Sequence, residues 1–481
     1  MQSPLTKATF KSLEFYSRDK TKEFKMQKSD IIKLKSQLRT LAFAVMKLVK
    51  KGINEKTLIP TEDTYFRWVL DEFEYSDKGI TKSKAHGEHF TKKSWGMAVI
   101  NLLKPIETMT EHKTLLKSLK PFKSDASKHC LFRFTGKVIN CYLDNKKIDE
   151  KQIDTFISVF LKELGGKPVK YGAAIELQGI VLRSNLIKIT HDITLRKVKK
   201  KDLEKGFLAL YPMGNHQRFV SNHTAILNIE FLGTNANEIQ QRMNKAIAIL
   251  RLFKPGSIRY VSCRRYSDSI IDVMASGKSI NANENSSLNK YLVIRKEEEK
   301  LIKFWKLLDK HLPESFFLSR NQSTDNKTIS YKRYSDALFR NGIIERRIAN
   351  VIMGLEALFL KNEPELSYKL SFRISKLLGL FDHEPLVVRK TIKDAYSIRS
   401  TFVHGDQIKG KEKKKLDDKY GNLNKLLLKV LGYLRVSIII TILCEKEKEE
   451  LIRLIDDSLI SKKRALELVA VMSMRKLEGI V

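Results

Sequence analysis

The segment at residues 395–406, AYSIRSTFVHGD, places the strongest constraint on the fold, because it fixes the point at which a helix must end. Glycine readily adopts the left-handed conformation that follows a last helical turn, so the segment predicts a helix that stops at Gly405. Arg399 and His404 stand five positions apart at this exit. Five residues turn through about 140° in mid-helix, where the two side chains would not share a face. At the helix end this constraint loosens, and His404 can turn back toward Arg399.

The pair combines two side-chain properties that suit cleavage of a phosphodiester. Arginine stays charged and binds phosphate through a planar fork of donors, and histidine is the residue type suited to proton transfer near neutral pH. From the spacing alone, a surface arginine and a histidine that caps a helix C-terminus are the better interpretation. Arg218 and His223 repeat the spacing in a stretch rich in Gly, Asn, His and Pro that has no helical period. We therefore expect this second match to be chance, and the surroundings to favour Arg399 and His404.

Three segments around the pair follow one another in a characteristic order: LEALF at residues 355–359, ELSYKLSFRISKLLG at 365–379 and DAYSIRSTFVHG at 394–405. In sequence and order they resemble the Apea-like HEPN domain, and the resemblance covers residues 333–444. It implies an up-and-down helical bundle that dimerises and often acts as a metal-independent endoribonuclease in bacterial or archaeal defence. The R-x4-6-H motif of the family falls on Arg399 and His404. Ser400 follows the arginine, where the wider superfamily more often has Asn, Asp or His.

The resemblance and the residue chemistry together predict roles for the site. In-line RNA cleavage by the 2′-hydroxyl needs a base on one side of the phosphorus and an acid on the other. His404 can serve as either, and a homodimer through the carboxy-terminal bundle would supply a second copy of it. Arg399 would bind the scissile phosphate. Glu356 is expected to orient Arg399 or His404, or only to form an ion pair. Ser400 is expected to contact the phosphate or to hydrogen-bond within its helix, and Arg373 to brace the bundle.

The composition is strongly basic, with 90 Lys and Arg against 55 Asp and Glu and a net charge of +35. This excess favours an anionic partner, a nucleic acid in the first place, although a lysine-rich surface that is merely solvated is the alternative. The lysines directly after the motif are candidates for a clamp on the RNA backbone, with a solvated loop as the alternative. They are Lys409, Lys411, Lys413, Lys414 and Lys415. A second basic run at residues 196–201 fits phosphate contact and a solvated strand end equally well.

The length of 481 residues and the hydrophobic fraction of 42% suit about three domains. We predict a mainly α, α+β multidomain protein with a mostly helical region at 1–125, a mixed α+β domain at 126–295 and a HEPN-like helical bundle at 296–481. Helices are expected at 30–50, 64–73, 95–103, 235–250, 297–312, 335–360, 366–380, 386–404, 416–444 and 446–477, and strands at 131–139, 174–182, 186–195, 224–232, 258–263 and 291–294. Ser29 and Gly52 are predicted to bound the first helix, residues 183–185 to form a hairpin turn, and Pro385 to lie in the first turn of its helix.

Other sequence features predict a cytoplasmic protein without cofactor or metal. The four cysteines are scattered, which is typical of reduced core residues rather than of a zinc site or disulfide framework. Residues 436–443 form the most apolar stretch near the end, and we interpret them as too short to span a membrane. No phosphate-binding glycine motif occurs.

Three functional hypotheses follow. The first is an endoribonuclease of HEPN type in antiviral defence or toxin action. The second is a catalytically inactive HEPN protein that binds nucleic acid or a protein partner. The third is an enzyme whose chemistry lies in the α+β domain, where we find no convincing set of residues. Residues 179–198 weakly resemble domains that precede HEPN domains, so an activating ligand or protein is expected at the amino-terminal part.

Overall fold

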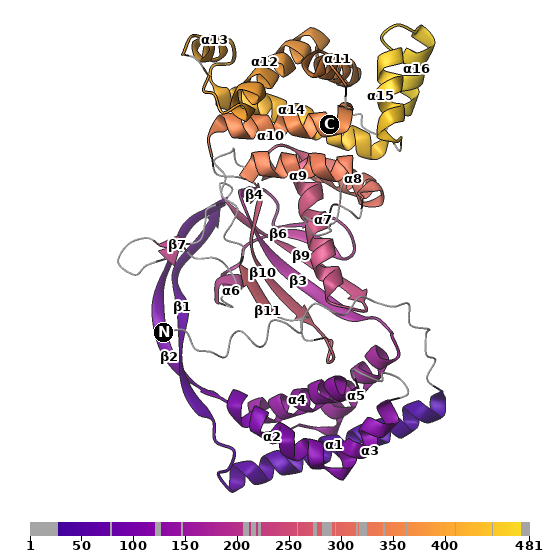
Figure 1. Ribbon diagram of the computed structural model, residues 1–481. Coiled ribbons are helices and arrows are strands. Elements are labelled where there is room, and N and C mark those ends of the chain that lie inside the picture. The colour runs from indigo at the N-terminus through magenta and orange to yellow at the C-terminus, as the bar shows by residue number, and fades with distance from the viewer. Residues whose placement is uncertain are drawn as a thin grey trace.

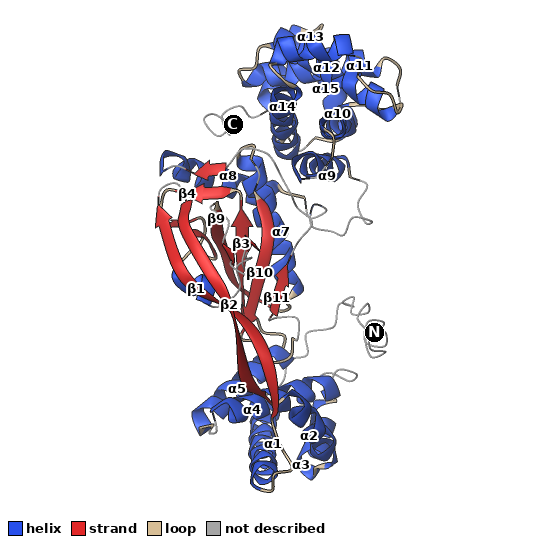
Figure 2. Ribbon diagram, turned by 90° about the vertical axis from the view of Figure 1, so that its left-hand side faces the viewer, coloured by secondary structure: helices blue, strands red, loops and turns tan. Residues whose placement is uncertain are grey.

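The computed structural model describes residues 27–76, 79–120, 127–145, 148–204, 211–212, 218–219, 223–256, 258–272, 277–280, 291–293, 295–313, 316, 325–339, 342–361, 363–408, 410–444 and 446–472. Helices gather at both ends of the molecule, and the strands lie between them (Figures 1 and 2). The protein is thus mainly α with a mixed α+β centre, as the sequence predicts at this coarse level.

The amino-terminal helices pack around a core of their own. They are α1 (Lys28–Asn54), α2 (Gly96–Thr108), α3 (Thr110–Leu119), α4 (Ser127–Asn145) and α5 (Glu150–Leu164). The predicted first helix is confirmed, but its predicted limits are wrong. Gln27 is the N-cap, and Gly52 lies inside the last turn, where an added Cβ would stand 3.1 Å from the Cβ of Leu58. An ion pair between Arg39 and Asp154 joins α1 to α5.

The strand predicted at 131–139 is wrong, because these residues belong to α4. Leu131, Phe134 and Val138 are fully buried at helical spacing, and their burial in the helical core overrides the strand propensity of the aromatic residues around them. The core formed by α1 to α5 therefore extends past the domain boundary that we predicted at residue 126, up to about Leu164.

A long antiparallel hairpin joins this helical core to the central domain. Its strands β1 (Thr61–Ser76) and β2 (Gly79–Ser94) pair from Thr61↔Ser94 to Ser76↔Gly79. Figure 1 shows the hairpin arching from the amino-terminal helices to the sheet. Near its turn, Ile80 packs with Val198 and Ile226 of the central domain. The helix predicted at 64–73 is therefore wrong; this segment is rich in aromatic residues, which favour strands.

The central sheet has the order β11-β10-β3-β9-β6-β5. Its strands are β3 (Val169–Gln178), β5 (Leu186–Lys188), β6 (Ile193–Lys197), β9 (Thr224–Gly233), β10 (Arg259–Ser267) and β11 (Gly277–Ile280). One face packs against α7 (Asn237–Phe253), whose predicted start near Asn235 is confirmed. The remaining elements of this part are β4 (Ile180–Leu182), β12 (Tyr291–Val293), β7 (Tyr211–Pro212), β8 (Arg218–Phe219), α6 (Lys200–Glu204) and α8 (Arg295–His311).

The connections within this domain differ from the predicted ones at one place. A hairpin turn was expected at residues 183–185, but β4 pairs in parallel with β12, whereas β5 pairs with β6. The strand predicted at 186–195 is wrong as one strand, because it divides into β5 and β6, which form the hairpin themselves. The strand predicted at 174–182 is likewise divided between the end of β3 and β4. The strands predicted at 224–232 and 258–263 are confirmed as β9 and β10, and the one at 291–294 as β12.

The carboxy-terminal bundle surrounds one apolar helix, α14 (Leu423–Leu443). Around it lie α9 (Asn326–Phe339), α10 (Ile344–Phe359), α11 (Leu366–Leu378), α12 (Pro385–Val403), α13 (Gly410–Tyr420), α15 (Lys448–Asp457) and α16 (Lys462–Val471), with the short 3-10 turn η4 (Gly379–Phe381). The helices predicted at 366–380 and 386–404 are confirmed, with Pro385 in the first turn of α12.

Three predicted helices are each divided into two. The helix predicted at 446–477 separates into α15 (Lys448–Asp457) and α16 (Lys462–Val471), and glycine is the physical reason for the other two breaks. The helix predicted at 335–360 is interrupted at Gly342, which has a φ of 152°, and the helix predicted at 416–444 is interrupted at Gly421, with a φ of 83°. Neither angle is helical, so no helix continues through these residues. The first break forms the α9–α10 turn, and the second lets α13 turn away from the core helix.

Helix α14 is long and apolar enough to cross a membrane by length and composition, because residues 436–443 are part of a 21-residue helix. The prediction that this stretch is too short was wrong in that respect. However, 83% of its most apolar window is buried inside the protein, which is typical of a core helix. Gly354 of α10 allows α10 and α14 to cross closely, since a Cβ at this position would stand 2.9 Å from a methyl group of Leu434 on α14.

The bundle is bonded to the central domain at the end of α7. The last four carbonyls of a helix have no partner within it. Here the carbonyl of Leu250 accepts from the Tyr291 hydroxyl at 3.0 Å, and that of Arg251 accepts from the Tyr334 hydroxyl at 3.1 Å. Arg435 of α14 donates to the carbonyls of residues 252 and 253 at 2.8 and 2.9 Å. Strand β12 and helices α9 and α14 thus complete the end of a helix that belongs to the sheet domain.

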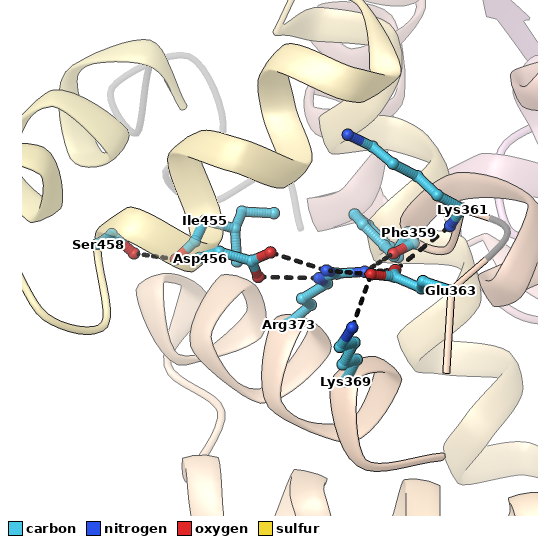
Figure 3. A network of polar contacts seen from close by, with 8 residues as sticks. All are labelled: Phe359, Lys361, Glu363, Lys369, Arg373, Ile455, Asp456 and Ser458. Carbon is cyan, nitrogen blue, oxygen red and sulfur yellow. Dashed lines mark hydrogen bonds and ion pairs between the residues drawn. The ribbon is translucent and has the colours of Figure 1, made fainter. Parts of the chain in front are cut away.

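A second buried arginine ties the outer helices of the bundle together (Figure 3). Arg373 of α11 donates to both carboxylate oxygens of Asp456 in α15, at 2.8 and 2.7 Å, and to the carbonyl of Phe359 at 2.8 Å. It also pairs with Glu363, which accepts from Lys369 at 3.0 Å. The guanidinium group of Arg373 holds the pKa of Glu363 down to about 2. The predicted bracing role of Arg373 agrees with these contacts.

Replacing Arg373 by alanine should lower the free energy of unfolding at pH 7 by about 3–5 kcal/mol, because it leaves buried acceptors unpaired. Glu363 ionises more readily in the folded state than in the unfolded state, so its contribution is present at neutral pH and is lost as the pH falls from 4.5 to about 2. Urea unfolding at several pH values should therefore show that the free energy of unfolding falls less over this pH range in Arg373→Ala than in the wild type.

The exposed side of the same network provides the control. Lys369→Ala removes a partner that is partly solvated, and it should cost less than about 1 kcal/mol. Equal losses in the two variants would contradict a special role of the buried guanidinium group.

Candidate functional site

The candidate site is built at the end of α12, where the predicted glycine stop is confirmed. The amide of Asp406 donates to the carbonyl of Thr401 at 3.0 Å, and that of Gly405 to the carbonyl of Phe402 at 3.1 Å. Gly405 has a φ of 82°, in the left-handed region. These two bonds form the helix-ending motif that glycine permits. His404 is the C-cap and is exposed, so its imidazole is carried on the last ordered turn of a well-anchored helix.

Arg399 points away from this exposed end, toward α10. Its Nη2 lies 3.1 Å from Oε2 of Glu356, and the two side chains are only 23% and 16% exposed. Burial raises the pKa of Glu356, while the charge of Arg399 and its hydrogen bond act in the opposite direction. The guanidinium carbon also lies 5.6 Å from the ring centroid of Tyr396. The ion pair that we considered for Glu356 is therefore formed, and Arg399 is its partner.

One donor and one acceptor of this pair remain available. Nε of Arg399 and Oε1 of Glu356 are both buried and have no hydrogen-bond partner among the described residues. A buried polar group without a partner is costly, so such atoms often mark a place where a ligand or water binds. The pair can therefore accept a further polar group without losing its existing bond.

The remaining catalytic candidates lie near this pair in the chain, but their side chains form no hydrogen bond or ion pair with it in the described part of the structure. Ser400 is half-exposed, and its carbonyl accepts the amide hydrogen of His404 at 3.1 Å. No hydrogen bond or ion pair joins the side chain of His404 to Arg399 or Glu356 in the described ranges. The expected return of His404 toward Arg399 therefore stays a prediction.

The lysines after the motif lie on α13, which packs beside α12. The hydroxyl of Ser397 donates to Glu412 at 3.1 Å, and the Tyr420 hydroxyl donates to Asp394 at 2.6 Å. The predicted loop is thus mostly a helix. Four of the five lysines predicted to follow the motif are described, and all four are exposed, namely Lys411, Lys413, Lys414 and Lys415. Lys409 lies outside the described residues. The site consequently has a cationic helix along one side.

The second arginine–histidine match is placed differently. Arg218 is on the short strand β8, and the carbonyl of His223 accepts from the amide of Gly179 at 2.7 Å. Neither residue is on a helix, as the sequence predicts. One residue of the basic run at 196–201 is already paired with an acid, because Arg196 donates two hydrogen bonds to Asp202 at 2.6 and 2.9 Å.

Sequence reasoning found no set of polar residues in the central domain, but the structure contains one on the sheet. Glu176 is fully buried and accepts from Ser262 at 2.7 Å and from Gln178 at 3.0 Å. Arg259 in turn donates to Gln178 at 3.1 Å. The only signal was a glutamate within the apolar run GAAIELQGI. The bonds join β3 to β10, so the cluster braces the sheet.

No family model, no curated protein and no solved structure matches the chain. The resemblance to the HEPN family therefore rests on the three sequence segments alone. Within the described residues, no three His, Cys, Asp or Glu side chains gather as a metal site would require.

A double-mutant cycle tests the pair at the centre of the site. Glu356→Ala and Arg399→Ala should each destabilise the protein, and their combined effect should be smaller than the sum by about 0.5–3 kcal/mol, because each single variant leaves a partly buried charge unpaired. Urea unfolding measures this coupling energy. A coupling energy near zero would contradict the ion pair.

Proposed function

We propose that this protein is a metal-independent endoribonuclease of HEPN type. The observation that carries the proposal is a phosphate-binding residue type, Arg399, fixed by Glu356 on α10, on the helix whose exposed end presents His404. The lysines of α13 and the net charge of +35 add support for an RNA substrate. A role in antiviral defence or toxin action in the cytoplasm belongs to the same proposal.

The proposed reaction follows from these residue types. A 2′-hydroxyl attacks the neighbouring phosphorus, the bond to the 5′-oxygen breaks, and the products are a 2′,3′-cyclic phosphate and a 5′-hydroxyl. His404 of one subunit removes the proton of the nucleophile, and His404 of a second subunit protonates the leaving oxygen. Arg399 binds the non-bridging oxygens, and Glu356 positions its guanidinium group. DNA lacks the nucleophile and resists cleavage.

His404→Ala should reduce RNA cleavage by about a hundred- to ten-thousand-fold, the usual effect of removing a general acid–base group. The fold should be unchanged, because His404 is exposed and lies outside the core. Arg399→Ala should also abolish cleavage. Arg399→Lys should restore little of the lost activity, since lysine lacks the planar fork of donors. Cleavage of mixed RNAs in EDTA, with analysis of the cut ends, measures both effects.

The chain supplies the control for this experiment. His223→Ala removes the histidine of the second arginine–histidine match and should leave cleavage nearly unchanged. The opposite result, with His223→Ala inactive and His404→Ala active, would move the active site to the central domain.

The lysines of α13 should govern the salt dependence of RNA binding. Each phosphate that a lysine neutralises releases counterions, so affinity falls with salt in proportion to the number of such contacts. Substituting glutamine at the four described positions, 411, 413, 414 and 415, should weaken binding and flatten the dependence of log Kd on log salt. Fluorescence anisotropy at several salt concentrations tests this, and an unchanged slope would place the contacts elsewhere.

The reaction needs two copies of His404, so we expect a homodimer formed through the carboxy-terminal bundle. Light scattering at micromolar concentration should give twice the mass of the chain. Mixing His404→Ala subunits with wild-type subunits should lower activity more than in proportion to their fraction. A fully active monomer would contradict the mechanism.

A second candidate function is supported by the same ion pair. Glu356 already engages Arg399, which a catalytically inactive protein that binds nucleic acid or a protein partner would tolerate. RNA binding without cleavage in EDTA or in Mg²⁺ would favour it. The same result would be obtained with an active enzyme that needs an activating ligand or protein at its amino-terminal part. Addition of cell extract to the assay distinguishes these cases, because it should start cleavage only if an activator was missing.

A further inference from the structure

We propose that the exposed face of α12 is the track along which single-stranded RNA reaches His404, and that Tyr368 of α11 is the platform on which a base stacks. This inference rests on the proposed function, since it names the form of RNA that the site takes. The observations that carry it are the alignment of exposed residues on α12, an aromatic side chain flanked by cations, and two lysines that form no ion pair among the described residues.

The alignment follows from helical geometry. At 100° per residue, positions 386, 390, 393, 397, 400 and 404 all point within about 40° of one direction. They are occupied by Leu386, Lys390, Lys393, Ser397, Ser400 and His404. All are exposed except the half-exposed Ser400. At 1.5 Å per residue this stripe is about 27 Å long, enough for several nucleotides, and it ends at the proposed catalytic histidine.

The far end of the stripe carries an exposed aromatic ring. Tyr368 is 50% exposed, and its ring centroid lies 4.5 Å from that of Phe372. The guanidinium carbon of Arg389 lies 3.8 Å from the Phe372 centroid and 5.8 Å from that of Tyr368. Nζ of Lys393 also lies 5.8 Å from the Tyr368 centroid. An exposed ring supported from behind and flanked by cations is the arrangement that stacks bases and binds the phosphates between them.

The two lysines of this face are not paired with neighbouring acids. Within the described residues, Lys390 and Lys393 form no ion pair. The nearby Asp394 is already bound by Lys419 and Tyr420, and Glu384 accepts from two amides of the first turn of α12. The acid that faces the stripe from α13 is Glu412, which accepts from Ser397. The stripe therefore has unpaired lysines on the side of Tyr368 and one carboxylate, that of Glu412, on the side of α13.

These features favour single-stranded RNA over other occupants. A second copy of the chain that covered Lys390 and Lys393 would bring the same cations to the same surface, so charge opposes dimerisation over this part of the stripe and leaves the end that carries His404 for the proposed dimer. In duplex RNA the bases are paired and stacked on one another, and they cannot also stack on Tyr368. An unpaired strand offers both free base faces and phosphates.

Binding experiments on the His404→Ala background, where the RNA stays intact, test the track. The probe is a labelled 20-nucleotide RNA, used as a single strand and as a blunt duplex. Tyr368→Ala should raise the Kd for the single strand by about 5- to 150-fold, the effect of losing one stacked base, while Tyr368→Phe should retain affinity. The Kd for the duplex should change less than twofold. The double substitution Lys390→Gln with Lys393→Gln should weaken binding of both the single strand and the duplex, and it should flatten the dependence of log Kd on log salt.

Matched controls lie on α1, far from the site in the fold. Phe43 is an exposed aromatic residue, and Lys47 and Lys50 are exposed with the same spacing as Lys390 and Lys393. Phe43→Ala and the double substitution of Lys47 and Lys50 by glutamine should leave the Kd unchanged. Losses equal to those at the α12 face would overturn the proposal, because binding would then follow only total charge and surface aromatics.

The outcome is separable from that of the proposed function. If the wild type cleaves RNA and Tyr368→Ala binds single strands normally, the track is wrong and the ribonuclease stands. If Tyr368→Ala loses single-strand binding but the wild type cleaves nothing, the track stands and the ribonuclease is wrong. If Tyr368→Ala instead changes the mass seen by light scattering, with RNA affinity intact, this face joins two copies of the chain and the proposal is overturned.

Discussion

The end of α7 is the point on which the arrangement of the molecule depends. A helix that stops inside a protein leaves four carbonyls, and an unpaired carbonyl in the interior is strongly unfavourable. Tyr291, Tyr334 and Arg435 reach these carbonyls from three separate elements. Burial raises the pKa of both tyrosines, so their hydroxyls stay protonated and donate. The positive charge of Arg435 also suits the negative end of the helix dipole.

This constraint explains why the central domain and the carboxy-terminal bundle share one hydrophobic core. Arg435 is on α14, the helix around which the bundle packs, so the bundle cannot rotate against the sheet without breaking the bonds to α7. Helix α10 crosses α14 at Gly354, only two residues before Glu356. The position of Glu356, and through it that of Arg399, is therefore set by packing that begins in the sheet domain.

Several features were predictable because they depend on a few neighbouring residues. The stop at Gly405 needs only a glycine that adopts a left-handed conformation, and the start at Pro385 needs only a ring that presets φ. The bracing role of Arg373 followed from an arginine in an apolar helix, although its partner Asp456 lies 83 positions away and was not predictable. The hairpin β1–β2 was not predicted, since its aromatic and charged residues fit a helical period as well as a strand. For the same reason α4 was predicted as a strand, although its residues form a helix.

Residue types and their spacing at a helix end are local properties, so the sequence alone was enough to identify the arginine and histidine at the end of α12. Arg399, His404 and the lysines of α13 could be named from it, as could the helix that carries the pair. Only the tertiary structure decided which groups meet. It set Glu356 against Arg399, placed Tyr368 beside Lys393, and joined Arg435 to a helix some 180 residues earlier in the chain. Such contacts depend on how faces of distant elements are buried together, and burial is a property of the whole fold.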